Sequence, residues 1–219
     1  MDIIIFTALT LSAMFGFVYG VVKFFREPSA LYSRMIVFGV GCMMLGRLFE
    51  TLQLVTAGEI HHGFHVGLLG IIGSFLFFLT ANYGQMDSLA DDGSPAMRKY
   101  RWMALAAPLA VTAIYMVIIF LAGWGEHAIV DGILTLVIAQ ASYYHLKHLI
   151  VPDVKGAIIY SIRGYNLMAL IYAALCMAEM IVKYLPPAFI IRYVIYGAQC
   201  VIAIVFIPVL EGGVKKWRI

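Results

Sequence analysis

Charged residues are scarce in this sequence. Lys, Arg, Asp and Glu make up 12% of its 219 residues, whereas hydrophobic residues make up 63% and the mean hydropathy is +0.94. A soluble domain carries roughly twice that share of charge. The composition therefore indicates a polytopic membrane protein with no separate soluble domain. The net charge of +3 comes without a basic stripe, which argues against nucleic-acid binding.

Cysteine pairs and a cleavable leader are also lacking. The three cysteines, Cys42, Cys176 and Cys200, are far apart and lie in apolar segments. Their spacing argues against a disulfide framework and a CxxC metal site, and we interpret them as small core residues. The N-terminal stretch MDIIIFTALTLSAM has neither a positive start nor a small-residue cleavage site. We therefore expect it to be the first span and not a removed signal.

Long apolar segments recur along the chain. A helix needs about 20 apolar residues to cross the hydrocarbon of a bilayer, and seven segments satisfy this condition. They are residues 3–25, 31–56, 62–83, 102–123, 128–150, 157–185 and 187–211. The sequence therefore predicts an all-α fold, with one seven-helix membrane domain over residues 1–219.

Basic residues gather at one end of the predicted spans. Twelve of the fifteen Lys and Arg residues flank the first, third and fifth connections or lie in the C-terminal tail. They are Lys23, Arg26, Arg34, Arg98, Lys99, Arg101, Lys147, Lys155, Arg163, Lys215, Lys216 and Arg218. Lys183 and Arg192 lie on the other side, and Arg47 lies within a span. Because cytoplasmic loops carry the excess of Lys and Arg, we predict an outside N-terminus and a cytoplasmic C-terminus.

Spans two and six begin alike. YSRMIVFGVGCMMLGRLFE and YSIRGYNLMALIYAALCMAE each open with Tyr-Ser and an arginine, Arg34 or Arg163. Each arginine is followed sixteen residues later by a glutamate, Glu50 or Glu179. Sixteen residues rise about 24 Å on a helix, so both glutamates are expected near the outer face.

This similarity predicts an internal duplication. The repeats would be residues 1–83 and 128–211, joined by a linking helix at 102–123, and they would run parallel about an axis along the membrane normal. Chance similarity between aliphatic helices is the alternative, and one sequence leaves it open.

The remaining ionisable groups gather in the predicted outer layer. Arg47 and Glu50 lie late in span two, Asp131 at the start of span five, and Glu179 at the end of span six. Since charges at membrane depth usually face a cavity or the bundle interior, we predict a polar binding site that opens outward. Two amides within the spans, Gln140 and Gln199, are expected to contact the ligand as well.

Local pairing is the alternative for both glutamates. Arg47 and Glu50 are three residues apart, and Glu179 and Lys183 are four apart. Residues at these spacings are neighbours on one helix. Each glutamate would then be neutralised on its own helix, with no ligand.

Histidines suggest a metal site. His61, His62 and His65 lie at the outer turn between spans two and three, and together with a carboxylate they would suit zinc. We expect no other cofactor. His145 and His148 share the inner end of span five. No other span offers a histidine at that depth, which argues against haem.

Motifs of catalysis are also absent. The chain has no GxSxG or HExxH motif, no glutamate pair of the intramembrane protease kind and no aspartate-rich transferase motif. Span seven lacks the lysine that a retinal protein needs. The sequence therefore argues against an enzyme.

Two families have similar features. FFREPSALYSRMIV after span one, Glu50 late in span two, and RKYRWMALAAPL leading to Pro108 resemble the seven-helix sensor modules at the N-terminus of some bacterial histidine kinases. That resemblance implies a receptor, and since the chain ends at VKKWRI it would signal through a separate cytoplasmic partner. The three-one-three layout is also similar to small sugar and vitamin transporters, although their proline-glutamine signature is missing.

Two functional hypotheses follow. The first is a small transporter or solute-binding protein of the cell membrane, of the bacterial cytoplasmic kind, whose outward-facing site takes a small cation or metal ion. The alternative is a stand-alone receptor that uses the same site. The expected partners are the bilayer, the ligand, and either a cytoplasmic signalling protein or further copies of this chain.

Overall fold

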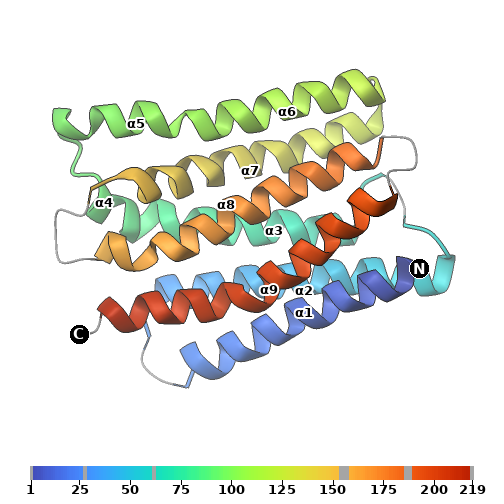
Figure 1. Cartoon of the computed structure of the whole chain (residues 1–219), viewed down its shortest axis with the longest axis horizontal. Coiled ribbons are helices and arrows are strands. Elements are labelled where there is room, and N and C mark those ends of the chain that lie inside the picture. The colour runs from blue at the N-terminus through green and yellow to red at the C-terminus, as the bar shows by residue number, and fades with distance from the viewer. Residues whose placement is uncertain (1, 27–28, 61–62, 153–157, 185–188, 218–219) are drawn as a thin grey trace.

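The structure is a computed structural model that describes residues 2–26, 29–60, 63–152, 158–184 and 189–217 (Figure 1). Within these residues the chain is helical, and seven helical segments are long and apolar enough to cross a membrane. The first three are α1 (Asp2–Phe24), α2 (Leu31–Ala57) and α3 (Val66–Ala81). The last three are α7 (Glu126–Ile150), α8 (Ile158–Val182) and α9 (Phe189–Trp217). The prediction of seven spans is confirmed; their orientation and the duplication stay predictions.

The third span is extended and the fourth is built from several pieces. A π-helical turn (Asn82–Met86) and the short α4 (Asp87–Ala90) continue α3. The fourth span then consists of a 3₁₀ turn (Pro95–Met97), α5 (Arg98–Ala104) and α6 (Ala106–Ala122). The helix breaks at Leu105, three residues before Pro108. Proline has no amide hydrogen to donate to the carbonyl of Ala104, which explains the break.

Two other helix ends differ from the prediction. The third span begins at Val66 because His65 caps it: the His65 Nδ1 atom accepts a hydrogen bond from the Leu68 amide at 3.2 Å. The last span continues through Pro208 to Trp217. A single proline therefore does not end this helix, although it removes one backbone hydrogen bond.

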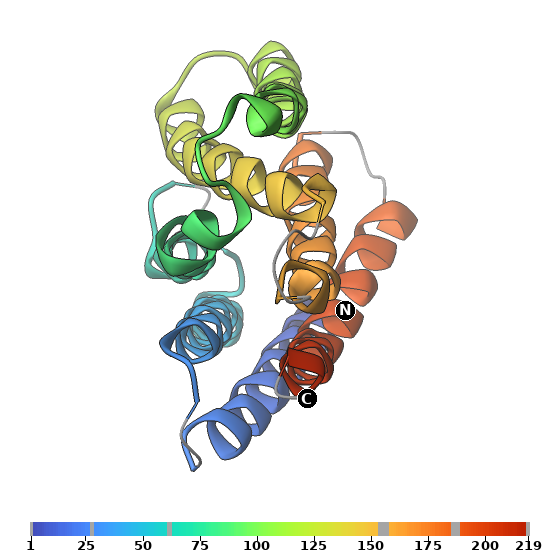
Figure 2. The ribbon, with the colours of Figure 1, turned by 90° about the vertical axis from the view of Figure 1, so that its left-hand side faces the viewer.

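Six of the spans form a ring. In order around it, α1 packs on α2, α2 on α3, α3 on α7, α7 on α8, α8 on α9, and α9 on α1. The α6 helix lies outside this ring against α7 and the edge of α8, as the view along the bundle shows (Figure 2). It is the least buried of the seven spans.

Aromatic side chains bridge the middle of the ring. Phe75 of α3 stacks on Tyr172 of α8, with ring centroids 5.3 Å apart, and Phe78 of α3 stacks on Phe206 of α9 at 5.0 Å. These helices are not neighbours in the ring, so their contacts cross its interior. The four side chains are buried, and they close the centre of the bundle.

Two glycines bring α2 and α3 into backbone contact. A Cβ atom added to Gly70 would lie 2.5 Å from the Cα atom of Gly46 and 2.7 Å from the carbonyl oxygen of Cys42. Small residues allow such close packing of helices in membranes. Because the neighbours here are backbone atoms, no side-chain rotation can relieve the clash.

We therefore expect Gly70→Ala to lower the free energy of unfolding by about 1–3 kcal/mol, since overpacking costs that much. Gly197→Ala is the matched control, because a Cβ atom there meets nothing within 4 Å and alanine favours a helix over glycine by about 1 kcal/mol. Thermal melting of both variants in one detergent checks this. Equal melting temperatures would contradict the close contact.

Candidate functional site

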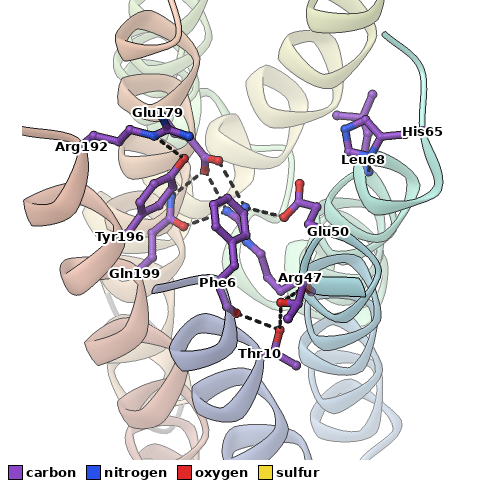
Figure 3. A network of polar contacts seen from close by, with 11 residues as sticks. Phe6, Thr10, Arg47, Glu50, His65, Leu68, Glu179, Arg192, Tyr196 and Gln199 are labelled. Carbon is purple, nitrogen blue, oxygen red and sulfur yellow. Dashed lines mark hydrogen bonds and ion pairs between the residues drawn. The ribbon is translucent and has the colours of Figure 1, made fainter. Parts of the chain in front are cut away.

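The guanidinium of Arg47 reaches across the ring from α2 to α8 and α9 (Figure 3). It donates to Glu50 Oε2 at 2.8 Å, to Glu179 Oε2 at 2.8 Å and Oε1 at 3.2 Å, and to Gln199 Oε1 at 2.7 Å. Gln199 in turn donates to Glu179 at 2.9 Å. We call these four residues the Arg47 cluster.

Burial explains why the Arg47 cluster is so fully bonded. Arg47 is 3% exposed, Glu50 7%, Glu179 9% and Gln199 2%. Charges removed from water are tolerated only when countercharges and hydrogen bonds replace the lost hydration. The planar guanidinium suits this because its five N–H donors form a rigid fork that can hold two carboxylates at once.

Neighbouring side chains hold Arg47 in place. Thr51 donates to the Arg47 carbonyl at 2.8 Å, and its hydroxyl also lies 2.9 Å from that of Thr10 on α1. The ring of Phe6 lies 6.0 Å from the guanidinium carbon, within cation–π range. Phe6 packs edge-on against Tyr196 of α9 at 5.2 Å. The α1 and α9 helices thus close the side of the cluster.

A small cavity of about 50 Å³ lies beside the cluster, at the end of the bundle predicted to face outward. Its charged lining residues are Glu50, Asp131, Glu179, Lys183 and Arg192. Three carboxylates and two bases therefore face it. Only Oε2 of Glu50 bonds to Arg47, and among the described residues its Oε1 makes no hydrogen bond.

Two tyrosines hold charged residues at the rim of this cavity. Tyr184 donates to Asp131 Oδ2 at 2.9 Å, and burial, followed by this hydrogen bond, raises the pKa of Tyr184. Arg192 donates from Nε to the Tyr196 hydroxyl at 3.2 Å. Both contacts keep the cavity wall ordered without using the free oxygen of Glu50.

The structure brings most of the predicted site residues together. Glu50 and Glu179 share Arg47 as their countercharge, Gln199 joins them, and Asp131 lines the same cavity. Gln140 does not: it lies in a different pocket between α6 and α7. Glu179 pairs with Arg47 across the ring, whereas the alternative hypothesis gave it Lys183 on its own helix.

Of the three predicted metal ligands, the structure describes one, His65. His61 and His62 lie outside the described residues. His65 caps α3 and stacks on Phe49 with ring centroids 6.4 Å apart. Within the residues that the structure describes, no three His, Cys, Asp or Glu side chains are grouped to hold a metal ion.

Sequence reasoning missed two contributors to the cluster, Thr10 and Tyr196 (Figure 3). Tyr196 had a signal, because Arg192, Tyr196 and Gln199 are four and three residues apart and so share one face of α9. Thr10 had none, since a threonine in a span usually donates to a carbonyl one turn earlier on its own helix, as Thr10 also does to that of Phe6.

A second polar cluster lies at the opposite end of the bundle. Lys147 of α7 is 4% exposed and pairs with Asp87 at 2.7 Å and Asp91 at 2.9 Å. His148 lies 3.3 Å from Asp87, and Arg101 pairs with Asp91 at 2.7 Å. We call these five residues the Lys147 cluster. They fasten the segment after α3 to α7.

His145 lies one turn deeper. Its Nδ1 atom is 2.7 Å from the amide nitrogen of Asn82 and 2.8 Å from the amide oxygen of Asn166. His145 and His148 thus each have protein partners, one among amides and the other beside a carboxylate.

No protein-family model, curated protein or solved structure matches this chain. The assignment of the candidate site therefore depends on the contacts and distances within this chain.

We expect Arg47→Gln to lower the free energy of unfolding by about 3–5 kcal/mol, because it leaves two buried carboxylates without a countercharge. Lys183→Gln removes the exposed base that follows on α8 and should change it by less than about 0.5 kcal/mol. Unfolding in mixed micelles compares the two. Similar losses would mean that Glu179 depends on Lys183 after all.

The Lys147 cluster should make stability depend on pH. Burial tends to raise the pKa of Asp91, but hydrogen bonds from Lys147, the Gly93 amide and Arg101 outweigh it and lower the pKa to about 2. A depressed carboxylate pKa stabilises the fold above its unfolded value, near pH 4, and this stabilisation is lost as pH falls towards 2. We expect the melting temperature of the wild type to exceed that of Asp91→Asn from pH 5 to 8, and the difference to shrink below about pH 4. A difference that stays constant down to pH 2.5 would contradict the pairing.

Proposed function

We propose that the protein takes up a small monovalent cation or a compact amine into the cavity beside the Arg47 cluster and carries it across the membrane. The observation that carries this proposal is the free Oε1 atom of Glu50 at the cavity wall. A carboxylate oxygen at membrane depth needs a partner. A cation of roughly the size of ammonium supplies one.

The charges near the cavity support a ligand with one positive charge. Arg47 gives two hydrogen bonds to Glu179 and only one to Glu50, so Glu50 is the less neutralised of the pair. Asp131 adds a second carboxylate, already bonded to Tyr184. Of the two bases, Lys183 is exposed to solvent, where water screens its charge, and Arg192 is held by Tyr196.

The cavity limits the size of the ligand. A volume of about 50 Å³ suits an ammonium ion or methylammonium. A sugar or a vitamin needs a pocket of several hundred Å³. Size and charge therefore both favour a small amine or alkali cation.

The ring order supports transport by two related halves. In the first half α1, α2 and α3 pack in sequence, and in the second α7, α8 and α9 do the same. The two contacts between the halves, α3 on α7 and α9 on α1, would also be equivalent if a two-fold axis related one half to the other. Parallel repeats arranged in this way are a common architecture of small transporters.

Arg47 would couple binding to movement. It belongs to the first half and ties it to Glu179 and Gln199 of the second. A cation that binds Glu50 and competes for Glu179 weakens this tie, so the ligand binds more tightly when the halves are apart. Such a difference in affinity between two states is what a ligand needs to drive a conformational change.

Uptake into proteoliposomes tests the proposal. With radiolabelled methylammonium as the probe, we expect wild-type uptake to fall at least tenfold in Glu50→Gln. Glu59→Gln is the matched control, since Glu59 is exposed just beyond α2 and lines no part of the cavity. Tetramethylammonium, too large for the cavity, should not compete.

The outcomes separate the hypotheses. Binding of methylammonium to the purified protein without uptake would overturn transport and favour the receptor alternative. Absence of both binding and uptake for methylammonium, sodium and potassium would overturn the site itself, as would normal uptake by Glu50→Gln.

A further inference from the structure

Gln140 is a polar side chain at a depth where the hydrocarbon of the bilayer supplies no hydrogen-bond partner. It is exposed on α7, ten residues from the end of that helix at Ile150. Ten residues rise about 15 Å, which is half the thickness of the hydrocarbon, about 30 Å. Within the described chain, Gln140 has no hydrogen-bond partner. An unpaired amide in hydrocarbon costs several kcal/mol, so its presence there indicates a ligand.

The surroundings of Gln140 form a groove of about 640 Å³. Its floor is α7, and its walls are the end of α3 on one side and Leu105 with α6 on the other. Every residue that lines it is uncharged. The volume lies in the range of sites for small organic ligands, about 300–1,000 Å³.

Polar atoms are few in this groove, and their roles can be assigned. Thr80 and Thr112 donate their hydroxyl protons to Leu76 and Pro108 carbonyls at 2.7 and 2.8 Å, so each keeps only lone pairs to offer. The amide of Gln140 is therefore the main donor at this depth. A ligand with an oxygen acceptor, either a carbonyl or a hydroxyl, suits it.

Three tyrosines form the end of the groove nearer the Lys147 cluster. The rings of Tyr83 and Tyr144 pack edge-on with centroids 5.4 Å apart, and Tyr143 packs on Tyr144 at 5.0 Å. Flat apolar walls of this kind take rings or branched hydrocarbon, and tyrosine is typical of the membrane–water interface. This end of the groove therefore lies towards the predicted cytoplasmic leaflet.

The length of the groove distinguishes between occupants. Along α7 it runs from Leu136 to Tyr144, which is about 12 Å. A membrane-spanning helix of a partner would need about 30 Å, so this groove would seat less than half of it. One leaflet is about 15 Å deep, and a molecule dissolved in that leaflet fits.

We propose that the groove between α3, α6 and α7 binds a neutral, bilayer-soluble molecule whose carbonyl or hydroxyl oxygen accepts a hydrogen bond from Gln140. Two classes share this chemistry, the alkylated quinones and the diacylglycerols. The site lies apart from the Arg47 cluster and does not depend on the function proposed above.

Native mass spectrometry of the purified chain tests this directly. The protein is titrated with decylubiquinone in one arm and with dioctanoylglycerol in the other. We expect one molecule bound per chain in at least one arm, and binding about five- to tenfold weaker in Gln140→Leu, which is the usual worth of one hydrogen bond.

Thr80→Phe is a second variant that fills the groove from an exposed position without touching Gln140. It should abolish the adduct. Val201→Phe is the control, because Val201 is 58% exposed on α9 and lines no part of the groove. Binding in only one arm identifies the class of ligand.

The same spectra contain the results that would overturn the proposal. They are absence of a one-to-one adduct in both arms, or binding that both groove variants leave unchanged. A dimer of the wild type that Gln140→Leu separates into monomers would also overturn it, because Gln140 would then be satisfied by a second copy of the chain.

Discussion

A buried guanidinium between two carboxylates is the interaction on which this bundle depends. Arg47 is the point at which α2, α8 and α9 meet across the ring. A hydrophobic contact would not specify which helices pack together here. Lipid tails are as apolar as the helices, so an apolar helix face has little preference for one neighbour over another. An ion pair in hydrocarbon does specify it, since any other arrangement leaves a charge unpaired.

The two polar clusters lie at opposite ends of the bundle, with aromatic side chains between them. Phe75, Tyr172, Phe78 and Phe206 fill the ring between the Arg47 cluster and His145. The protein is thus closed in its middle and fastened at both ends. Under the transport hypothesis, these aromatic side chains separate a ligand at Glu50 from the Lys147 cluster.

The sequence predicted at which depth along the helix axes many residues lie, but not towards which neighbour each helix face points. Helix length and hydropathy gave the spans, and the sixteen-residue spacing placed Glu50 and Glu179 at one depth, where they do lie. The rotation of each helix about its axis could not be predicted, because the spans are apolar on nearly all faces. For that reason the sequence placed Gln140 beside the two glutamates, whereas it lines a different pocket. Spacing along one helix likewise suggested Lys183 as the partner of Glu179, which pairs with Arg47.

The contact between Gly46 and Gly70 has a mechanical consequence. With backbone directly against backbone, α2 and α3 are held at a close spacing that any larger residue at either glycine would widen. Arg47 stands next to one glycine of this pair, and Asn82 lies twelve residues beyond the other, about 18 Å further along α3. The glycine contact therefore links the helix that carries Arg47 to the helix that ends beside His145.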